Sequence, residues 1–183
     1  MMKSIAHESA HLHVTGEATF ADDIPQLAGT LFIALFISEK AHAKIEAIDF
    51  SAVEASAGVV SIITAYDIVG ANDCGPIIQD DPILSADEVN YIGQPIFAVV
   101  ADSYLNARKA VKKAHVTYHE LEAVFDLDEA DKRQSYVLPP MLLKKGNTQQ
   151  VFNESDLQLE GRFKVGGQEH FYLEGQVAYA VPQ

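Results

Sequence analysis

The sequence predicts an α+β fold, a mixed sheet with packed helices, and two features carry that prediction. Residues 30–37, TLFIALFI, are an apolar run of strand length. Residues 89–120 contain a buried strand, a helix with one apolar face and a second strand, which together can form a helix-covered sheet. With 183 residues and a hydrophobic content of 48%, the chain is long enough to bury one well-filled core.

Loops and strands alternate in the first part of the chain. Pro25 and Gly29 mark a loop that precedes the strand at residues 30–37. Residues 43–51 alternate imperfectly between apolar and polar side chains and predict a second strand.

A third strand is expected in the β-branched run that begins GVVSIIT at Gly58. Asp67 follows this run and is expected to cap a short helical turn, because its carboxylate can accept hydrogen bonds from free backbone N–H groups. Residues 70–82, GANDCGPIIQDDP, have the composition of a loop.

Residues 89–120 form the clearest unit of the chain. Asp102 or Ser103 can cap the helix that follows the buried strand. A helix is expected over residues 104–114, because small and apolar side chains recur there at helical spacing. The residues of this face are Tyr104, Ala107, Val111 and Ala114. Residues 115–121, HVTYHEL, then return as a strand.

The composition changes at about residue 123. Residues 125–147 are charged and contain prolines, so they predict an irregular connector with a short acidic helical turn. Residues 156–183 alternate between apolar and polar side chains on both sides of Gly166 and Gly167, which predicts a β-rich segment.

Charge and cysteine content limit the function classes. The formal net charge of −13 makes nucleic acid an unlikely partner, because an acidic surface repels phosphates. No apolar run is long enough to span a bilayer, so no membrane partner is expected. Cys74, the one cysteine, excludes an internal disulfide and fits a reducing compartment, which predicts a cytoplasmic protein. A lone loop thiol is more often incidental than a nucleophile.

A zinc-protease pattern lies near the start of the chain. His7, Glu8 and His11 spell H-E-x-x-H, in which two imidazoles on one helical face bind zinc. The following residues, LHVTGEATF, favour a strand-like run over a continuing helix, and no supported third ligand follows. We therefore interpret the motif as a chance match, with the zinc protease kept as a rival that metal analysis would test.

The stretch GGQEHFYLE, residues 166–174, is the strongest candidate for a functional site. Gly166 and Gly167 can adopt positive φ and let the backbone approach another group closely. They precede Gln168, followed by acidic, imidazole and aromatic side chains. The residues alone do not distinguish a site from an ordinary hairpin turn, for which Gly-Gly is a common signal.

This stretch resembles a signature of the xanthine dehydrogenase and aldehyde oxidase family of molybdenum hydroxylases. Further segments are similar to the same family in the same order, from about residue 11 onward. They are HVTGEATFADDIP (13–25), AHAKIEAID (41–49), VNYIGQPIFAVVAD (89–102) and VTYHELEAV (116–124). The likeness is greatest to the molybdenum-binding subunits of bacterial xanthine dehydrogenases, and it implies that the chain is their N-terminal portion.

The resemblance implies a fold and a domain plan. Residues 14–122 would form the family's α/β hammerhead domain, after a mobile leader at 1–13. Residues 123–183 would be a connector and the beginning of the first molybdopterin-binding domain. The family hydroxylates purines or aldehydes at a molybdenum–molybdopterin centre, and electrons leave through 2Fe–2S clusters and FAD, which bacterial enzymes carry on a partner subunit.

Among the site residues of the family, the resemblance carries over Gln168, beside the molybdenum, with Gly166 and Gly167 allowing close approach. Phe171 and Tyr172 would brace the loop through burial. No residue here matches the family's catalytic base, so the chain alone is expected to be inactive, with the rest of the molybdenum subunit, the FAD/iron–sulfur subunit and a purine as partners. An aldehyde oxidase-type enzyme and a non-catalytic hammerhead scaffold are the alternatives.

Overall fold

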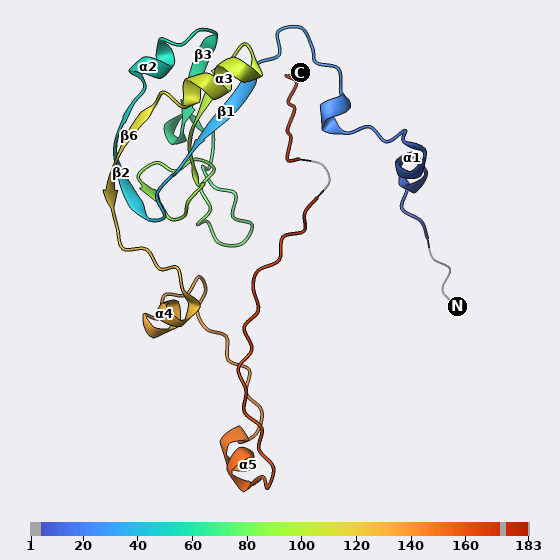
Figure 1. Cartoon of the computed structure of the whole chain (residues 1–183), viewed down its shortest axis with the longest axis vertical. Helices are drawn as coiled ribbons and strands as arrows, with labels where there is room; N and C mark the ends of the chain where they lie inside the picture. Colours follow the sequence, from blue (N-terminus) through green and yellow to red (C-terminus); the bar gives the residue numbers. More distant parts are fainter. Residues whose placement is uncertain (1–4, 173–174, 183) are drawn as a thin grey trace. The chain divides into compact units, whose positions relative to one another are not determined.

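A computed structural model describes residues 5–172 and 175–182 of the chain. The chain divides into two units, Leu27–Pro139 and the pair of segments Met1–Gln26 and Pro140–Gln183 (Figure 1). Within the described residues, no helix is both long and apolar enough to cross a membrane.

The unit Leu27–Pro139 contains two three-stranded antiparallel sheets (Figure 1). The first has the order β1-β5-β3 and the second the order β4-β2-β6. Their strands are β1 (Phe32–Ile37), β2 (Ala43–Asp49), β3 (Val59–Thr64), β4 (Glu88–Val89), β5 (Pro95–Ala101) and β6 (His115–Glu120). The α+β class is confirmed. A mixed sheet was expected, and the unit instead has two antiparallel sheets.

Strand β5 lies at the centre of the first sheet, because its side chains are apolar in both directions and can be covered on both faces. Phe97 is fully buried, with its ring stacked on Phe36 at 4.8 Å between centroids. The ring of Phe50 meets Phe97 edge-on at 4.9 Å. This aromatic cluster belongs to a core to which both sheets contribute.

Helix α3 (Tyr104–Val111) packs on β1 and β5 and buries Ala107, Ala110 and Val111. Ser103 is its N-cap, since its Oγ accepts a hydrogen bond from the Asn106 backbone N–H at 3.3 Å. The helix ends three residues before the predicted end, where the Lys113 N–H bonds back to the Ala110 carbonyl and the chain turns toward β6.

Asp67 does not cap the turn after β3, so that prediction was wrong in position. Asp67 is the last residue of the 3₁₀ turn η2 (Ala65–Asp67). Its carboxylate accepts from the backbone N–H and the hydroxyl of Thr64, at 2.8 and 2.7 Å. Thr64 therefore occupies the cap position, and the spacing T-x-x-D places the acidic residue where it reaches back to the cap.

The remaining helical elements are short. Helix α2 (Ser51–Glu54) begins where the predicted second strand was expected to end, and α4 (Leu127–Lys132) is the predicted acidic turn, capped by Asp126. Outside this unit lie α1 (Ala10–Thr15), the 3₁₀ turn η1 (Ala21–Asp23) and α5 (Thr148–Glu154). Sequence patterns did not indicate α5, which Asn147 caps by accepting from the Gln150 N–H at 3.2 Å.

The predicted β-rich segment is wrong for the residues described here. None of residues 157–172 and 175–182 forms a strand, and all of them are exposed. Alternating side chains make a strand only where a neighbouring strand supplies hydrogen-bond partners and a sheet face to pack on. Within the described part of this segment, the chain runs without such a neighbour.

Candidate functional site

The segment that carries the family signature is described from Gly166 to Tyr172, and residues 173 and 174 lie outside the described part. The left-handed backbone of this segment is at Phe171, with φ 54°, and neither Gly166 nor Gly167 has a positive φ. The positive φ that these two glycines could adopt is therefore not used in this structure. The rings of His170 and Tyr172 stack at 5.5 Å, with an angle of 2° between their planes.

The residues of this segment do not form a molybdopterin site by themselves. A Cβ added at Gly166 or Gly167 would meet no atom within 4 Å, so no group crowds their backbone. Gln168 is exposed, and Phe171 and Tyr172, expected to be buried braces, are 91% and 73% exposed. A cofactor pocket encloses most of its ligand, whereas this loop is open on all sides.

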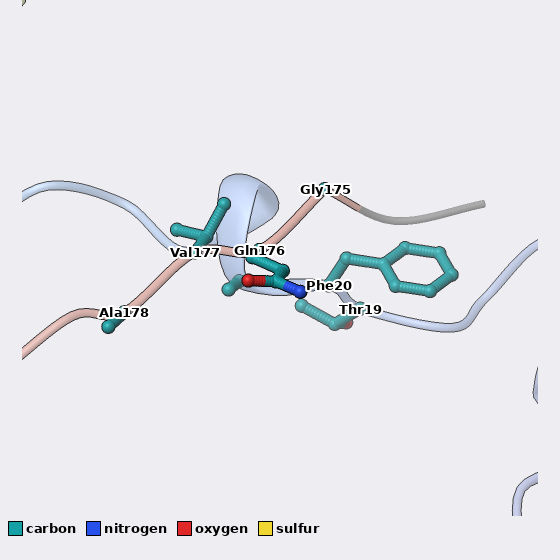
Figure 2. Close-up of a pocket in the computed structure, with 7 residues that line it drawn as sticks. Thr19, Phe20, Gly175, Gln176, Val177 and Ala178 are labelled. Carbon is teal, nitrogen blue, oxygen red and sulfur yellow. The ribbon is translucent and has the colours of Figure 1, made fainter. Parts of the chain in front are cut away.

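A shallow hollow of about 540 Å³ lies elsewhere in the unit to which this segment belongs. Figure 2 shows the Gln176 carboxamide beside Thr19 and Phe20, where residues 175–178 approach the stretch that leads into η1. The lining residues are Thr19, Phe20, Ala21, Gly175, Gln176, Val177 and Ala178. The described residues that line the hollow carry no ionisable side chain and do not include Gln168, so they offer hydrogen bonds but no acid or base.

The histidines near the N-terminus do not share a helical face in the way that H-E-x-x-H requires. Helix α1 begins at Ala10, so His7 precedes it, and the His7 Nδ1 accepts from the Ser9 N–H at 3.2 Å. His11 lies inside the helix. The predicted strand-like run after His11 is wrong, since the helix continues to Thr15 before it ends at Gly16, with φ 77°.

No group of three or more His, Cys, Asp or Glu side chains within residues 5–172 and 175–182 could hold a metal ion. Cys74 is exposed in its loop, where its backbone N–H donates to the Asp81 carbonyl at 2.7 Å. The Asp73 carboxylate accepts from the Gly75 N–H at 2.7 Å, so it organises the turn around the thiol.

A polar network that sequence reasoning missed lies beside the sheet β4-β2-β6. His42, just before β2, has its Nδ1 2.7 Å from the Glu122 carbonyl oxygen and its Nε2 3.1 Å from the Glu88 Oε1. The Glu122 carboxylate pairs with Arg133 at 2.7 Å, and Arg133 also donates to Glu129 at 2.6 Å. Glu129 and Arg133 have the local i,i+4 spacing of a helix, whereas His42 is too distant in sequence from Glu88 and Glu122 for a local pattern to have linked them.

The network shifts the pKa of several of its members. The pKa of His42 is raised, and the largest cause is the hydrogen bond to the Glu122 carbonyl, followed by the hydrogen bond to the Glu88 carboxylate. Arg133 lowers the pKa of Glu122, and the carboxylates of Glu122 and Glu129 raise the pKa of Arg133. A hollow of about 490 Å³ opens beside these groups, lined in part by His42, Tyr91 and Glu122.

Comparison with known proteins identifies the class of this fold. Residues 15–122 match the family model described as "Aldehyde oxidase and xanthine dehydrogenase, a/b hammerhead domain". Residues 129–183 match the model of a molybdopterin cofactor-binding domain. The predicted hammerhead fold, followed by the start of a molybdopterin-binding domain, is therefore confirmed.

The chain belongs to the aldehyde oxidase and xanthine dehydrogenase family, as its resemblance predicted. It is 42% identical to aldehyde oxidase 2 of Rattus norvegicus over 182 residues, which is 99% of the chain. It is 41% identical to xanthine dehydrogenase of Oryza sativa subsp. japonica over 181 residues, or 97% of the chain. The chain spans 13% of the length of each of these curated relatives.

Solved structures give the same class. The chain superposes on the aldehyde oxidoreductase from Desulfovibrio desulfuricans with a TM-score of 0.61 and 32% identity, over 69% of this chain and 15% of that one. It superposes on CO dehydrogenase from Oligotropha carboxidovorans with a TM-score of 0.60 and 27% identity, over 69% of this chain and 16% of that one.

Proposed function

We propose that the chain is part of the molybdenum-binding subunit of a xanthine dehydrogenase, which hydroxylates hypoxanthine and xanthine to urate in purine catabolism. The observation that carries this proposal is the pair of family-model matches, hammerhead and then molybdopterin-binding domain, over residues 15–122 and 129–183. The GGQEHFYLE signature within the second match supports it, as does 41% identity to a xanthine dehydrogenase.

In this proposal the unit Leu27–Pro139 is a packed scaffold, and the exposed segment after it is completed by further protein. Apolar side chains of the segment support this division of roles, because they stand in solvent where a finished domain would cover them. Those more than 80% exposed include Leu157, Leu159, Phe163 and Val165. The open loop at Gln168 would then become a site only when other parts of the subunit enclose it.

Gln168 is the residue of this chain that we propose to lie beside the molybdenum–molybdopterin centre, with Gly166 and Gly167 leading to it. A carboxamide can donate a hydrogen bond without adding charge, so it can orient groups around a metal centre from outside the coordination shell. Molybdopterin with molybdenum would supply the hydroxylation chemistry. FAD and 2Fe–2S clusters on a partner subunit would accept the electrons, and the assembly would work in the cytoplasm.

An aldehyde oxidase-type enzyme is the second candidate. Aldehyde oxidase 2 of Rattus norvegicus and of Macaca fascicularis are 42% and 43% identical to the chain, against 39% for xanthine dehydrogenase/oxidase of Gallus gallus. These values favour neither substrate class. Discrimination between a purine and an aldehyde depends on side chains that contact the substrate.

The test is an assay of the complete molybdenum subunit with its flavin and iron–sulfur partner on xanthine, hypoxanthine and an aromatic aldehyde. We expect kcat/KM to be highest for the two purines. A preference for the aldehyde would favour the aldehyde oxidase-type enzyme. If the cofactor-loaded assembly turned over none of the three compounds, the non-catalytic hammerhead scaffold would be the remaining hypothesis. The chain of 183 residues alone is expected to bind no molybdopterin and to turn over neither class.

A single substitution tests the place of Gln168. In the complete assembly, Gln168→Ala is expected to lower kcat by about tenfold, within the range observed when a group that supports a metal site from outside its ligand shell is removed. Gln149→Ala is the matched control, because Gln149 is an exposed glutamine of α5 that bonds only to Asn153 among its described partners. Equal activity of the two variants, with equal molybdenum content, would remove Gln168 from the site.

A further inference from the structure

His42 stands between two hydrogen-bond acceptors. Its Nδ1 is 2.7 Å from the backbone carbonyl of Glu122, and its Nε2 is 3.1 Å from the carboxylate of Glu88. Glu88 belongs to β4, whereas Glu122 lies just after β6 in the connector that leads to α4. One imidazole ring therefore joins the start of β2, the short strand β4 and the connector.

The chemistry of these partners determines which form of the ring fits. A carbonyl oxygen and an ionised carboxylate accept hydrogen bonds but cannot donate them. A neutral imidazole has one N–H, so it can satisfy one of the two contacts and turns a lone pair toward the other acceptor. The imidazolium has an N–H on each nitrogen and satisfies both contacts at once, so the geometry selects the charged ring.

The contact extends from His42 to α4. The side chain of Glu122, whose carbonyl accepts from His42, is paired with Arg133 at 2.7 Å. Arg133 follows the last residue of α4 and also donates to Glu129, within the helix, at 2.6 Å. The backbone carbonyl of Glu122 is thus bonded to the His42 ring, and the carboxylate of the same residue is paired with Arg133 at the end of α4.

We propose that protonated His42 is a clasp that holds the connector, residues 121–133, against the sheet β4-β2-β6, and that the connector loosens when His42 loses its proton. Residues 129–133 of the connector already belong to the match with the molybdopterin-binding model, which begins at residue 129. The clasp would make the start of that region sensitive to pH. The inference depends on contacts within the unit Leu27–Pro139 and not on the proposed substrate.

Several charged groups near the ring are ion-paired, and Lys44 of β2 lies opposite Glu88 in the strand register. Arg133 is balanced by Glu122 and Glu129. On β6, Glu120 pairs with Lys40 at 2.5 Å, and Tyr91 lines the same hollow as His42. Glu88 is thus the carboxylate bonded to the ring, and the raised pKa of His42 agrees with both of its contacts.

The direction of the pH effect follows from linkage. Because the pKa of His42 is raised on folding, the clasp contributes its full stability below about pH 6.5, the value for a free histidine. That contribution disappears as the pH rises through the folded-state pKa. The His42 and Glu88 side chains are 31% and 40% exposed, so solvent screens their attraction and the effect is modest.

The test combines NMR titration of the histidine rings with amide hydrogen exchange in the full chain. We expect His42 to titrate above pH 6.5 and to carry protons on both nitrogens at pH 5.5. Between pH 6 and pH 9, protection factors of residues 121–133, corrected for the intrinsic exchange rate, should fall about two- to five-fold.

Two variants separate the clasp from general effects of pH. His42→Gln keeps a donor but cannot titrate, so it should remove the pH dependence of protection in the connector. His119→Gln, at an exposed histidine of the neighbouring strand β6, should leave it unchanged. A His42 ring that titrates at or below pH 6.5 in the unaltered chain would overturn the proposal, as would equal pH dependence in all three proteins. If His42→Gln does not fold, the ring titration and the exchange of residues 121–133 in the unaltered chain decide the question together, because the proposal requires both to change over the same pH range.

Discussion

At the scale of single residues, Gly58 is the position where backbone shape and packing coincide. Its φ of +77° lies in the left-handed region, and its carbonyl accepts a hydrogen bond from the Asp102 N–H at 2.9 Å. A Cβ at Gly58 would come within 2.3 Å of the Asp102 Oδ1, which itself accepts from the Asn106 Nδ2 at 2.7 Å. The turn before β3 and the start of α3 therefore depend on this glycine.

We expect Gly58→Ala to lower the free energy of unfolding by about 2–4 kcal/mol, from left-handed strain together with displacement of the Asp102 carboxylate. Gly29→Ala is the matched control, because Gly29 has φ +83° with nothing within 4 Å of an added Cβ. It should cost about 1–2 kcal/mol from strain alone. Urea unfolding followed by circular dichroism measures both, and equal losses would show that the contact with Asp102 is not a constraint.

The difference between a predicted residue role and an observed one is clearest at Asp67 and Gly166. Asp67 was predicted to be the N-cap of a turn that follows it, but it is the last residue of a turn that Thr64 begins. The spacing T-x-x-D indicates that Thr64 and Asp67 can bond to each other, but which of them begins the turn depends on where β3 ends. Glycine can adopt a positive φ but does not have to, and Gly166 does not adopt one. The left-handed backbone of this segment is at Phe171.

At the scale of elements, α3 shows how a cap and a buried face act together. Ser103 accepts from the Asn106 N–H, and the helix buries Ala107, Ala110 and Val111 against the first sheet. Because the helix has only eight residues, it is too short to be stable without its cap and its packing.

Ser103→Ala is therefore expected to destabilise the protein by about 1 kcal/mol, the usual cost of losing an N-cap side chain. Ser103→Asn, which restores an acceptor at the cap, should recover most of that loss. Thermal unfolding and amide exchange of residues 104–111 provide the measurement. If asparagine and alanine are equally destabilising, the Ser103 hydroxyl contributes through packing and not through the hydrogen bond.

Elements with local signals could be predicted from the sequence, and those that depend on distant partners could not. β1, β5, α3 and β6 have apolar periodicity of their own and were found near their predicted positions. The division into two sheets depends on pairings such as β2 with β6, between residues far apart in the chain. The network around His42 was missed for the same reason, since Glu88 and Glu122 lie 46 and 80 residues away from it.

At the scale of the whole molecule, the two units differ in how much they bury. The core residues lie in the unit Leu27–Pro139, whereas no described residue of 140–182 is buried. Burial of apolar side chains is the main contribution that opposes chain entropy, so a segment without it opens at little free-energy cost. The two parts of the chain should therefore differ in their resistance to proteolysis.

Limited trypsin digestion of the 183-residue chain is expected to cut first in the segment after Pro139, at Lys144, Lys145, Arg162 and Lys164, which are exposed and lie outside helices and strands. The exposed α3 residues Arg108 and Lys109 are the internal control, because cutting there requires the helix to leave β1 and β5. We expect cleavage after α3 residues to be at least about tenfold slower, and the fragment that ends near residue 145 to keep its circular dichroism spectrum. Mass spectrometry over a time course gives both rates. Equal rates, or loss of the spectrum once the segment after residue 145 is removed, would mean that the scaffold depends on that segment for its own stability.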